Sequence, residues 1–126
     1  MRPATLAEVA LLASHGDAFD RCLANFLDDF YPAPTAAALA DPPALLAPTL
    51  GDLGHVEDAY LAATAEHLAW THGLPMPGWV LGDARKLHRP WFASPLAALR
   101  AVLLLESPAA FRSRNLFVSE NALSRV

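Results

Sequence analysis

The sequence predicts an all-α fold: a compact orthogonal bundle of about six helices, formed by residues 1–126 as a single domain with a proline-rich connector. Ala and Leu together account for 48 of the 126 residues, and Ile is absent. Ala and Leu favour helix, whereas strands are enriched in β-branched residues. Apolar residues also recur at three- and four-residue spacing, and no segment shows the apolar–polar alternation of a strand.

The first two predicted helices lie within residues 5–31. Thr5 and Glu8 stand three residues apart, as in a capping box, and predict a helix that ends at about Ser14. Asp17 is the predicted N-cap of a second helix that runs to about Tyr31. One face of this helix is apolar and the other acidic, so the apolar face is expected to cover the core. That face consists of Phe19, Cys22, Leu23, Phe26, Leu27 and Phe30.

Residues 32–50 contain five prolines, which interrupt long helices because proline lacks a backbone N–H. Only short helical turns are expected, at residues 35–40 and 43–46. The segment also carries leucines that should be buried, so it is predicted to be an ordered connector. Whether the domain divides near 32–50 stays open. The leucines are Leu39, Leu45, Leu46 and Leu50.

The longest predicted helix covers residues 53–72 and ends at Gly73, in the left-handed conformation typical of a helix C-cap. A short helix is expected at 82–87, before Pro90. The inner face of the long helix is predicted from helical spacing. It consists of Leu53, Val56, Tyr60, Leu61, Thr64, His67, Leu68 and Thr71.

Two Ser-Pro pairs, at 94–95 and 107–108, have the form of a serine N-cap followed by proline in the first helical turn. The first pair predicts a helix to Leu105 that is apolar nearly all round, apart from Arg100, and is therefore expected to be the central buried element. The second predicts a short helix ending near Arg114. Asn115 is expected to end that helix in a left-handed conformation, before an extended segment at 116–118 and a last helical turn.

The sequence contains no recognisable catalytic or metal-binding constellation. Cys22 is the only cysteine, which excludes an intrachain disulfide, and its place on an apolar face predicts a buried hydrophobe rather than a nucleophile. His55, His67 and His72 lack the i, i+3 or i, i+4 spacing of a helical zinc pair. There is also no glycine-rich phosphate loop and no nucleophile elbow. We therefore expect a protein that is not an enzyme and has no cofactor or metal.

Charge is distributed unevenly along the chain. Residues 1–78 hold ten acids and two bases, a net charge of −8, and residues 79–126 hold seven bases and three acids, a net charge of +4. The overall charge of −4 argues against nucleic-acid binding. No apolar stretch approaches the roughly 20 residues that span a bilayer. With no signal-peptide layout at the start, the sequence predicts a cytoplasmic protein.

Two stretches combine arginine with aromatic residues: RKLHRPWF at 85–92 and the segment 107–119. They have two interpretations. The aromatic residues, Trp79 included, could fill the core while the bases balance the acidic half, or the stretches could form a docking surface, since arginine and aromatic residues are enriched in interface hot spots. Two positions on the short helix, 112 and 114, cannot share a face, so one arginine is expected to pair internally with Glu106 or Glu120. The candidate partner-binding residues are Arg85, Arg89, Trp91, Arg112 and Arg114.

The stretches AEHLAWTHGLPMPGWV, RPWF and ESPAAFRSRNLFVSENALSR resemble a small uncharacterised family of bacterial helical proteins. They are also similar to the block that follows a helix-turn-helix in some antitoxin-like regulators. The resemblance covers about residues 58–125 and implies a component that binds another protein, such as an antitoxin acting on its toxin. The chain departs from those regulators at residues 5–31, where the second helix is acidic outside and would repel phosphate.

Together these observations predict a non-enzymatic protein–protein interaction module that binds a toxin, another protein or a second copy of itself. The alternative is a small-molecule or anion-binding domain, conceivably an enzyme, in which His88, Arg89 and Arg112 surround a phosphate or carboxylate.

Overall fold

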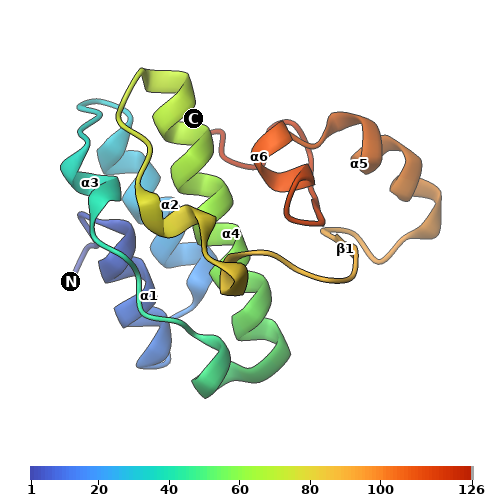
Figure 1. Cartoon of the computed structure of the whole chain (residues 1–126), viewed down its shortest axis with the longest axis horizontal. Helices are drawn as coiled ribbons and strands as arrows, with labels where there is room; N and C mark the ends of the chain where they lie inside the picture. Colours follow the sequence, from blue (N-terminus) through green and yellow to red (C-terminus); the bar gives the residue numbers. More distant parts are fainter. Residues whose placement is uncertain (126) are drawn as a thin grey trace.

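The structure of the protein, a computed structural model, describes residues 1–125 and confirms the predicted compact all-α fold. The helices are α1 (Leu6–Ser14), α2 (Phe19–Phe30), α3 (Ala37–Ala40), α4 (Ala47–His72), α5 (Arg100–Glu106) and α6 (Ala109–Arg112). Three short 3-10 helices accompany them: η1 (Gly78–Leu81), η2 (Asp83–Arg85) and η3 (Ala97–Leu99). Figure 1 shows α1 to α4 side by side, with α6 next to α4 and α5 at the opposite end from the N-terminus.

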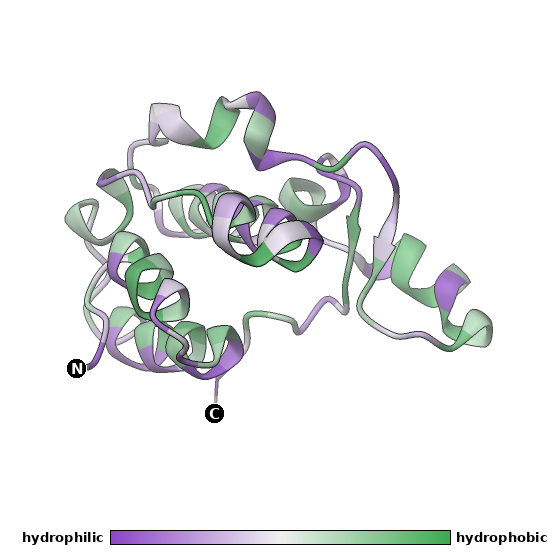
Figure 2. Cartoon of the chain, turned by 90° about the horizontal axis from the view of Figure 1, so that it is seen from below, coloured by the Kyte–Doolittle hydropathy of each residue, from purple (hydrophilic) through white to green (hydrophobic). Residues whose placement is uncertain are grey.

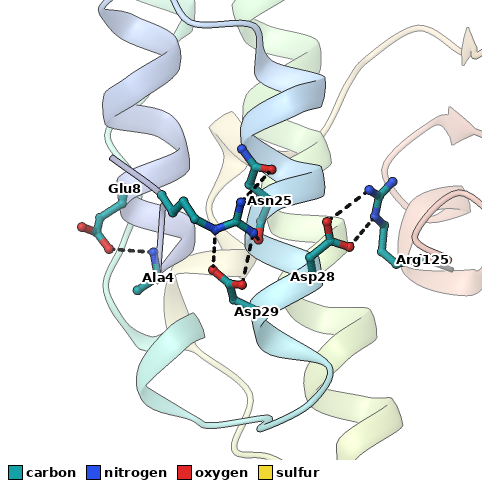
Figure 3. Close-up of polar contacts among 7 residues, drawn as sticks. Ala4, Glu8, Asn25, Asp28, Asp29 and Arg125 are labelled. Carbon is teal, nitrogen blue, oxygen red and sulfur yellow. Dashed lines mark hydrogen bonds and ion pairs between the residues drawn. The ribbon is translucent and has the colours of Figure 1, made fainter.

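Thr5 caps α1 as predicted: its hydroxyl accepts a hydrogen bond from the Glu8 backbone N–H at 3.1 Å. The return bond of the predicted capping box is shifted by one residue, because the Glu8 carboxylate accepts from the Ala4 N–H at 3.0 Å (Figure 3) and not from the Thr5 N–H. The apolar face of α2 is buried as predicted, Cys22 included, except for Phe19, which is partly buried. The predicted Asp17 cap is wrong. Ala18 occupies the N-cap position, because the Asp17 N–H bonds to the Leu12 carbonyl in the turn that follows α1.

The helix α4 is longer than expected and is bent. It begins at Ala47, and Gly51 interrupts it with a positive φ of 67°, a conformation that glycine adopts readily. Leu53 was predicted on the inner face but is 61% exposed. Gly73 ends α4 in the left-handed conformation as predicted, with a φ of 65°.

The connector between α2 and α4 is ordered, and two of its leucines are buried in the core. Leu39 and Leu46 are fully buried, and the Leu39 carbonyl accepts a hydrogen bond from the Trp79 indole at 2.9 Å. Leu45 and Leu50 were expected to be buried but are exposed. The predicted turn at 43–46 does not form a helix, whereas α3 lies within the first predicted turn.

Residues 91–117 contain a small sheet that the sequence did not predict. Strands β1 (Trp91–Phe92) and β2 (Leu116–Phe117) pair in parallel, with Trp91 opposite Leu116. The connection between them carries η3, α5 and α6. Ser107 was expected to cap α6, but it lies at the end of α5, where its hydroxyl contacts the Leu103 and Val118 carbonyls and accepts from the Val118 N–H.

The largest correction concerns α5. This helix was predicted to be the central buried element, yet only Leu103 among its residues is buried. Figures 1 and 2 both show α5 at the edge of the molecule, and in Figure 2 most of its ribbon has the colour of apolar residues. The core lies instead among α1, α2, α4 and α6, and includes Phe26, Leu61 and Phe111.

Candidate functional site

Arg85 and Asp58 form a buried ion pair. Asp58 is fully buried and Arg85 is 6% exposed, and 3.8 Å separates Arg85 Nη1 from Asp58 Oδ1. The guanidinium group also donates to the Pro43 carbonyl and lies over the Trp79 ring, 4.9 Å from its centre. Burial lowers the pKa of Arg85, and the Asp58 charge opposes this effect. Arg85 is therefore a structural residue and is not available to a partner.

Arg114 is likewise an interior residue, 5% exposed. Its Nη2 donates to Glu66 Oε1 at 2.9 Å and to the Val80 carbonyl at 3.0 Å, and its Nη1 donates to the Ala110 carbonyl at 2.7 Å. One of the arginines at positions 112 and 114 was expected to pair internally, and Arg114 does so. Its partner is Glu66, however, and not Glu106 or Glu120 as expected. Asn115 has a φ of 63°, which confirms the predicted left-handed conformation.

The remaining predicted contact residues lie at the surface or at its edge. Trp91 is half-buried and belongs to β1. Arg89 and Arg112 are exposed, and neither forms an ion pair with any residue in 1–125. Of the seven bases in the C-terminal part, three pair with acids of the first part. These pairs are Arg85–Asp58, Arg114–Glu66 and Arg125–Asp28, the last shown in Figure 3.

The residues of the alternative anion site, His88, Arg89 and Arg112, are all exposed, and none of them lines either of the two hollows described below. Nor do residues 1–125 contain a group of three or more His, Cys, Asp or Glu side chains arranged around a position for a metal ion.

The segment that contains η3 and α5, residues 94–106, presents a concentrated apolar surface and is called the α5 arm below. Its exposed large side chains range from 41% exposure at Leu99 to 83% at Leu105. Arg100 belongs to the arm and lies over the Phe92 ring, 5.2 Å from its centre. Contiguous exposed apolar residues are typical of interaction sites. The exposed residues are Leu96, Leu99, Val102, Leu104 and Leu105.

A second exposed apolar feature lies beside the start of α6. Trp70, at the end of α4, is 83% exposed, and with Met76 it lines a hollow of about 360 Å³. Pro108 and Ala109 form another side of this hollow, immediately after the α5 arm in the sequence.

A larger cleft, of about 680 Å³, lies between α2, α4 and the C-terminal segment and is called the α2–α4 cleft. Its walls are mainly apolar, and Asp20, Glu57 and Arg125 are the charged residues that line it. Glu57 is only 8% exposed, and its Oε1 accepts no hydrogen bond within residues 1–125. Burial raises the pKa of Glu57, and repulsion from Asp20 and Asp58 raises it further. The apolar residues include Phe19, Leu23, Val56, Tyr60, Trp91 and Val118.

Comparison with protein-family models, with curated proteins and with solved structures finds no match to this chain. The resemblance to antitoxin-like regulators therefore stays a prediction. No helix within residues 1–125 has both the length and the apolar character needed to cross a membrane.

The sequence interpretation missed the two features that the structure makes prominent. The leucines of α5 were assigned to the core because an apolar run looks the same whether it is buried or lies on an unpartnered surface. Glu57 was not considered, although a signal existed. It falls at helical spacing between Leu53 and Tyr60, on the face of the long helix that was predicted to point inward.

Proposed function

We propose that this protein is a non-enzymatic interaction module that inserts its α5 arm into an apolar groove on a partner protein. The observation that carries the proposal is the exposure of five large aliphatic side chains within residues 96–105. Each buried aliphatic side chain is worth about 1.5–3 kcal/mol relative to its exposed state, so a surface that covers the arm gains considerable free energy. The insertion of a helix into an apolar groove through its exposed apolar side chains is a common mode of protein recognition.

The charge of this region supports an acidic partner. Residues 86–112 carry four bases and one acid, a net charge of +3. Arg89, Arg100 and Arg112 have no carboxylate partner within residues 1–125, so they remain available for acidic groups at the rim of a groove. Such charges steer association and make it dependent on salt. Arg89 and Arg112 are thus retained from the predicted contact residues, whereas Arg85 and Arg114 are not.

A narrower form of the proposal is that the partner is the toxin of a toxin–antitoxin pair and that binding takes place in the cytoplasm. The resemblance over residues 58–125 and the single cysteine support it. Identification of the captured partner tests this narrower form separately.

The test is the capture of partners by the tagged full chain at low and moderate salt, with Leu104→Asn/Leu105→Asn as the decisive variant. We expect this variant to lose binding by roughly 30-fold or more, as hot-spot residues do when truncated. Its free energy of unfolding should stay within about 0.5 kcal/mol of the parent, because both side chains are exposed.

The matched control is Leu11→Asn/Leu81→Asn, which changes two exposed leucines outside the arm. This control should capture the partner as well as the parent chain does. If both double variants captured the same amount of partner, the α5 arm would not be the binding surface. Light scattering of the parent chain alone tests whether a second copy of the chain covers the arm instead of another protein. A dimer that becomes a monomer in Leu104→Asn/Leu105→Asn would show that it does.

A further inference from the structure

The α2–α4 cleft has the form of a ligand site and is distinct from the α5 arm. Its volume of about 680 Å³ falls within the range of small-molecule sites, roughly 300–1,000 Å³. Like those sites it combines apolar walls with a few polar groups. Two aromatic side chains in its wall, Phe19 and Tyr60, are arranged edge to face with their ring centres 6.0 Å apart, and Trp91 contributes a third ring.

Glu57 is the unusual feature of this cleft. A buried carboxyl oxygen without a hydrogen-bond partner costs free energy, and proteins rarely leave such a group unpaired. Burial raises the pKa of Tyr60 to about 12, and the charge of Asp20 raises the pKa values of both Tyr60 and Glu57 further. The cleft therefore contains two acidic groups, and the buried one, Glu57, has an oxygen with no hydrogen-bond donor within residues 1–125.

Residues 1–125 do not supply the missing donor. Among them Arg125 is the only base that lines the cleft, and both its Nε and its Nη2 donate to Asp28 on the outer side of α2, at 2.8 and 3.2 Å (Figure 3). A ligand with a positively charged donor would satisfy Glu57 and would relieve its repulsion with Asp20. Aromatic walls also favour a cation, since ring faces attract positive charge.

We propose that the α2–α4 cleft binds a small organic cation, a protonated amine with an aromatic or aliphatic body, whose ammonium group is held by Glu57 and Asp20. The apolar body lies against the walls that Phe19, Tyr60 and Trp91 provide. This sign of charge is opposite to that of the anion site considered from the sequence.

The experiment is a titration of the full chain with 2-phenylethylamine, followed by the amide shifts in a two-dimensional NMR spectrum. We expect saturable shifts that concentrate in α2 and in the part of α4 around Glu57. The neutral analogue 2-phenylethanol should bind at least roughly tenfold more weakly, and the anion 3-phenylpropionate more weakly still, because both lack the charged donor.

Glu57→Gln keeps the shape of the side chain and removes its charge, and it should weaken amine binding by roughly tenfold or more. Asp41→Asn, which neutralises an exposed acid outside the cleft, should leave the affinity unchanged. Should Glu57→Gln fail to fold, Asp20→Asn provides the same test at an exposed position. The proposal is overturned by shifts that do not saturate, by equal affinity for the amine and the alcohol, or by unchanged affinity in both cleft variants.

Discussion

Asp58 shows how a single buried carboxylate organises the start of α4. Its Oδ1 accepts a hydrogen bond from the Leu46 N–H at 2.7 Å, and its Oδ2 accepts one from the Ala47 N–H at 3.1 Å. The first N–H groups of a helix have no partner within the helix, so this carboxylate caps the first turn from a distance. Arg85 neutralises the charge and ties the connector to the same point through the Pro43 carbonyl.

Replacement of Arg85 by Met should therefore destabilise the fold. We expect a loss of about 3–5 kcal/mol in the free energy of unfolding, because Asp58 would remain as a buried charge without its counterion. Urea unfolding followed by circular dichroism measures this loss as a lower midpoint. Arg89→Met is the control, since Arg89 is exposed and unpaired within residues 1–125, and it should change stability by no more than about 0.5 kcal/mol. A similar effect of both replacements would contradict the structural role of Arg85.

At the scale of elements, the start of α4 depends on close backbone packing between Gly54 and the residues at which the helix begins. Beyond the bend at Gly51, the chain returns so that Gly54 lies against the backbone of Leu46 and Ala47. A Cβ atom at Gly54 would stand 2.8 Å from the Ala47 nitrogen and still closer to the Leu46 carbonyl. Backbone atoms cannot move aside as a flexible side chain can, so this position requires glycine.

Gly54→Ala should accordingly lower the free energy of unfolding by about 1–3 kcal/mol, the usual cost of an overpacked site. Thermal unfolding followed by circular dichroism gives the measurement, as a fall in Tm. Gly78→Ala is the matched control because the same added atom would meet nothing within 4 Å and the φ of Gly78 is not positive. If Gly54→Ala were as stable as Gly78→Ala, the bend at Gly51 would not have the described geometry.

The whole molecule brings its two charged parts into contact. The C-terminal segment returns to α2, where the Tyr31 hydroxyl donates to the Leu123 carbonyl at 2.6 Å and Arg125 pairs with Asp28 at 2.8 Å. Asp29, the next residue of α2, pairs with Arg2 at 3.1 Å (Figure 3). Both ends of the chain are thus held by the acidic face of α2. The hydrogen bond from Arg125 lowers the pKa of Asp28 below its usual value of 3.8.

Because the pKa of Asp28 is lower in the folded than in the unfolded chain, the pair stabilises the fold above pH 3.8 and this contribution is lost as the pH falls through the folded-state pKa. Arg125→Ala should return the pKa of Asp28 towards 3.8, which NMR titration of the carboxyl group measures directly. Arg112→Ala removes an exposed arginine that has no contact with Asp28 and should leave that pKa unchanged. An unshifted pKa in Arg125→Ala would mean that the C-terminal segment is not held at α2.

The sequence by itself determined those features whose information lies within a few consecutive residues. Local spacing and local backbone preference predict the Thr5 N-cap of α1, the buried face of α2 and the left-handed conformations of Gly73 and Asn115. The all-α class follows for the same reason, since it sums many local preferences.

Only the tertiary structure decided which surfaces are covered and which charges meet. Arg114 and Glu66 are 48 positions apart in the chain, and no local pattern relates them. The α5 arm has the composition of a core helix but lies at the edge of the molecule, and the core is formed by side chains of the other helices and of the C-terminal segment. Burial depends on what the rest of the chain brings to each face, and this is information that a short stretch of sequence does not contain.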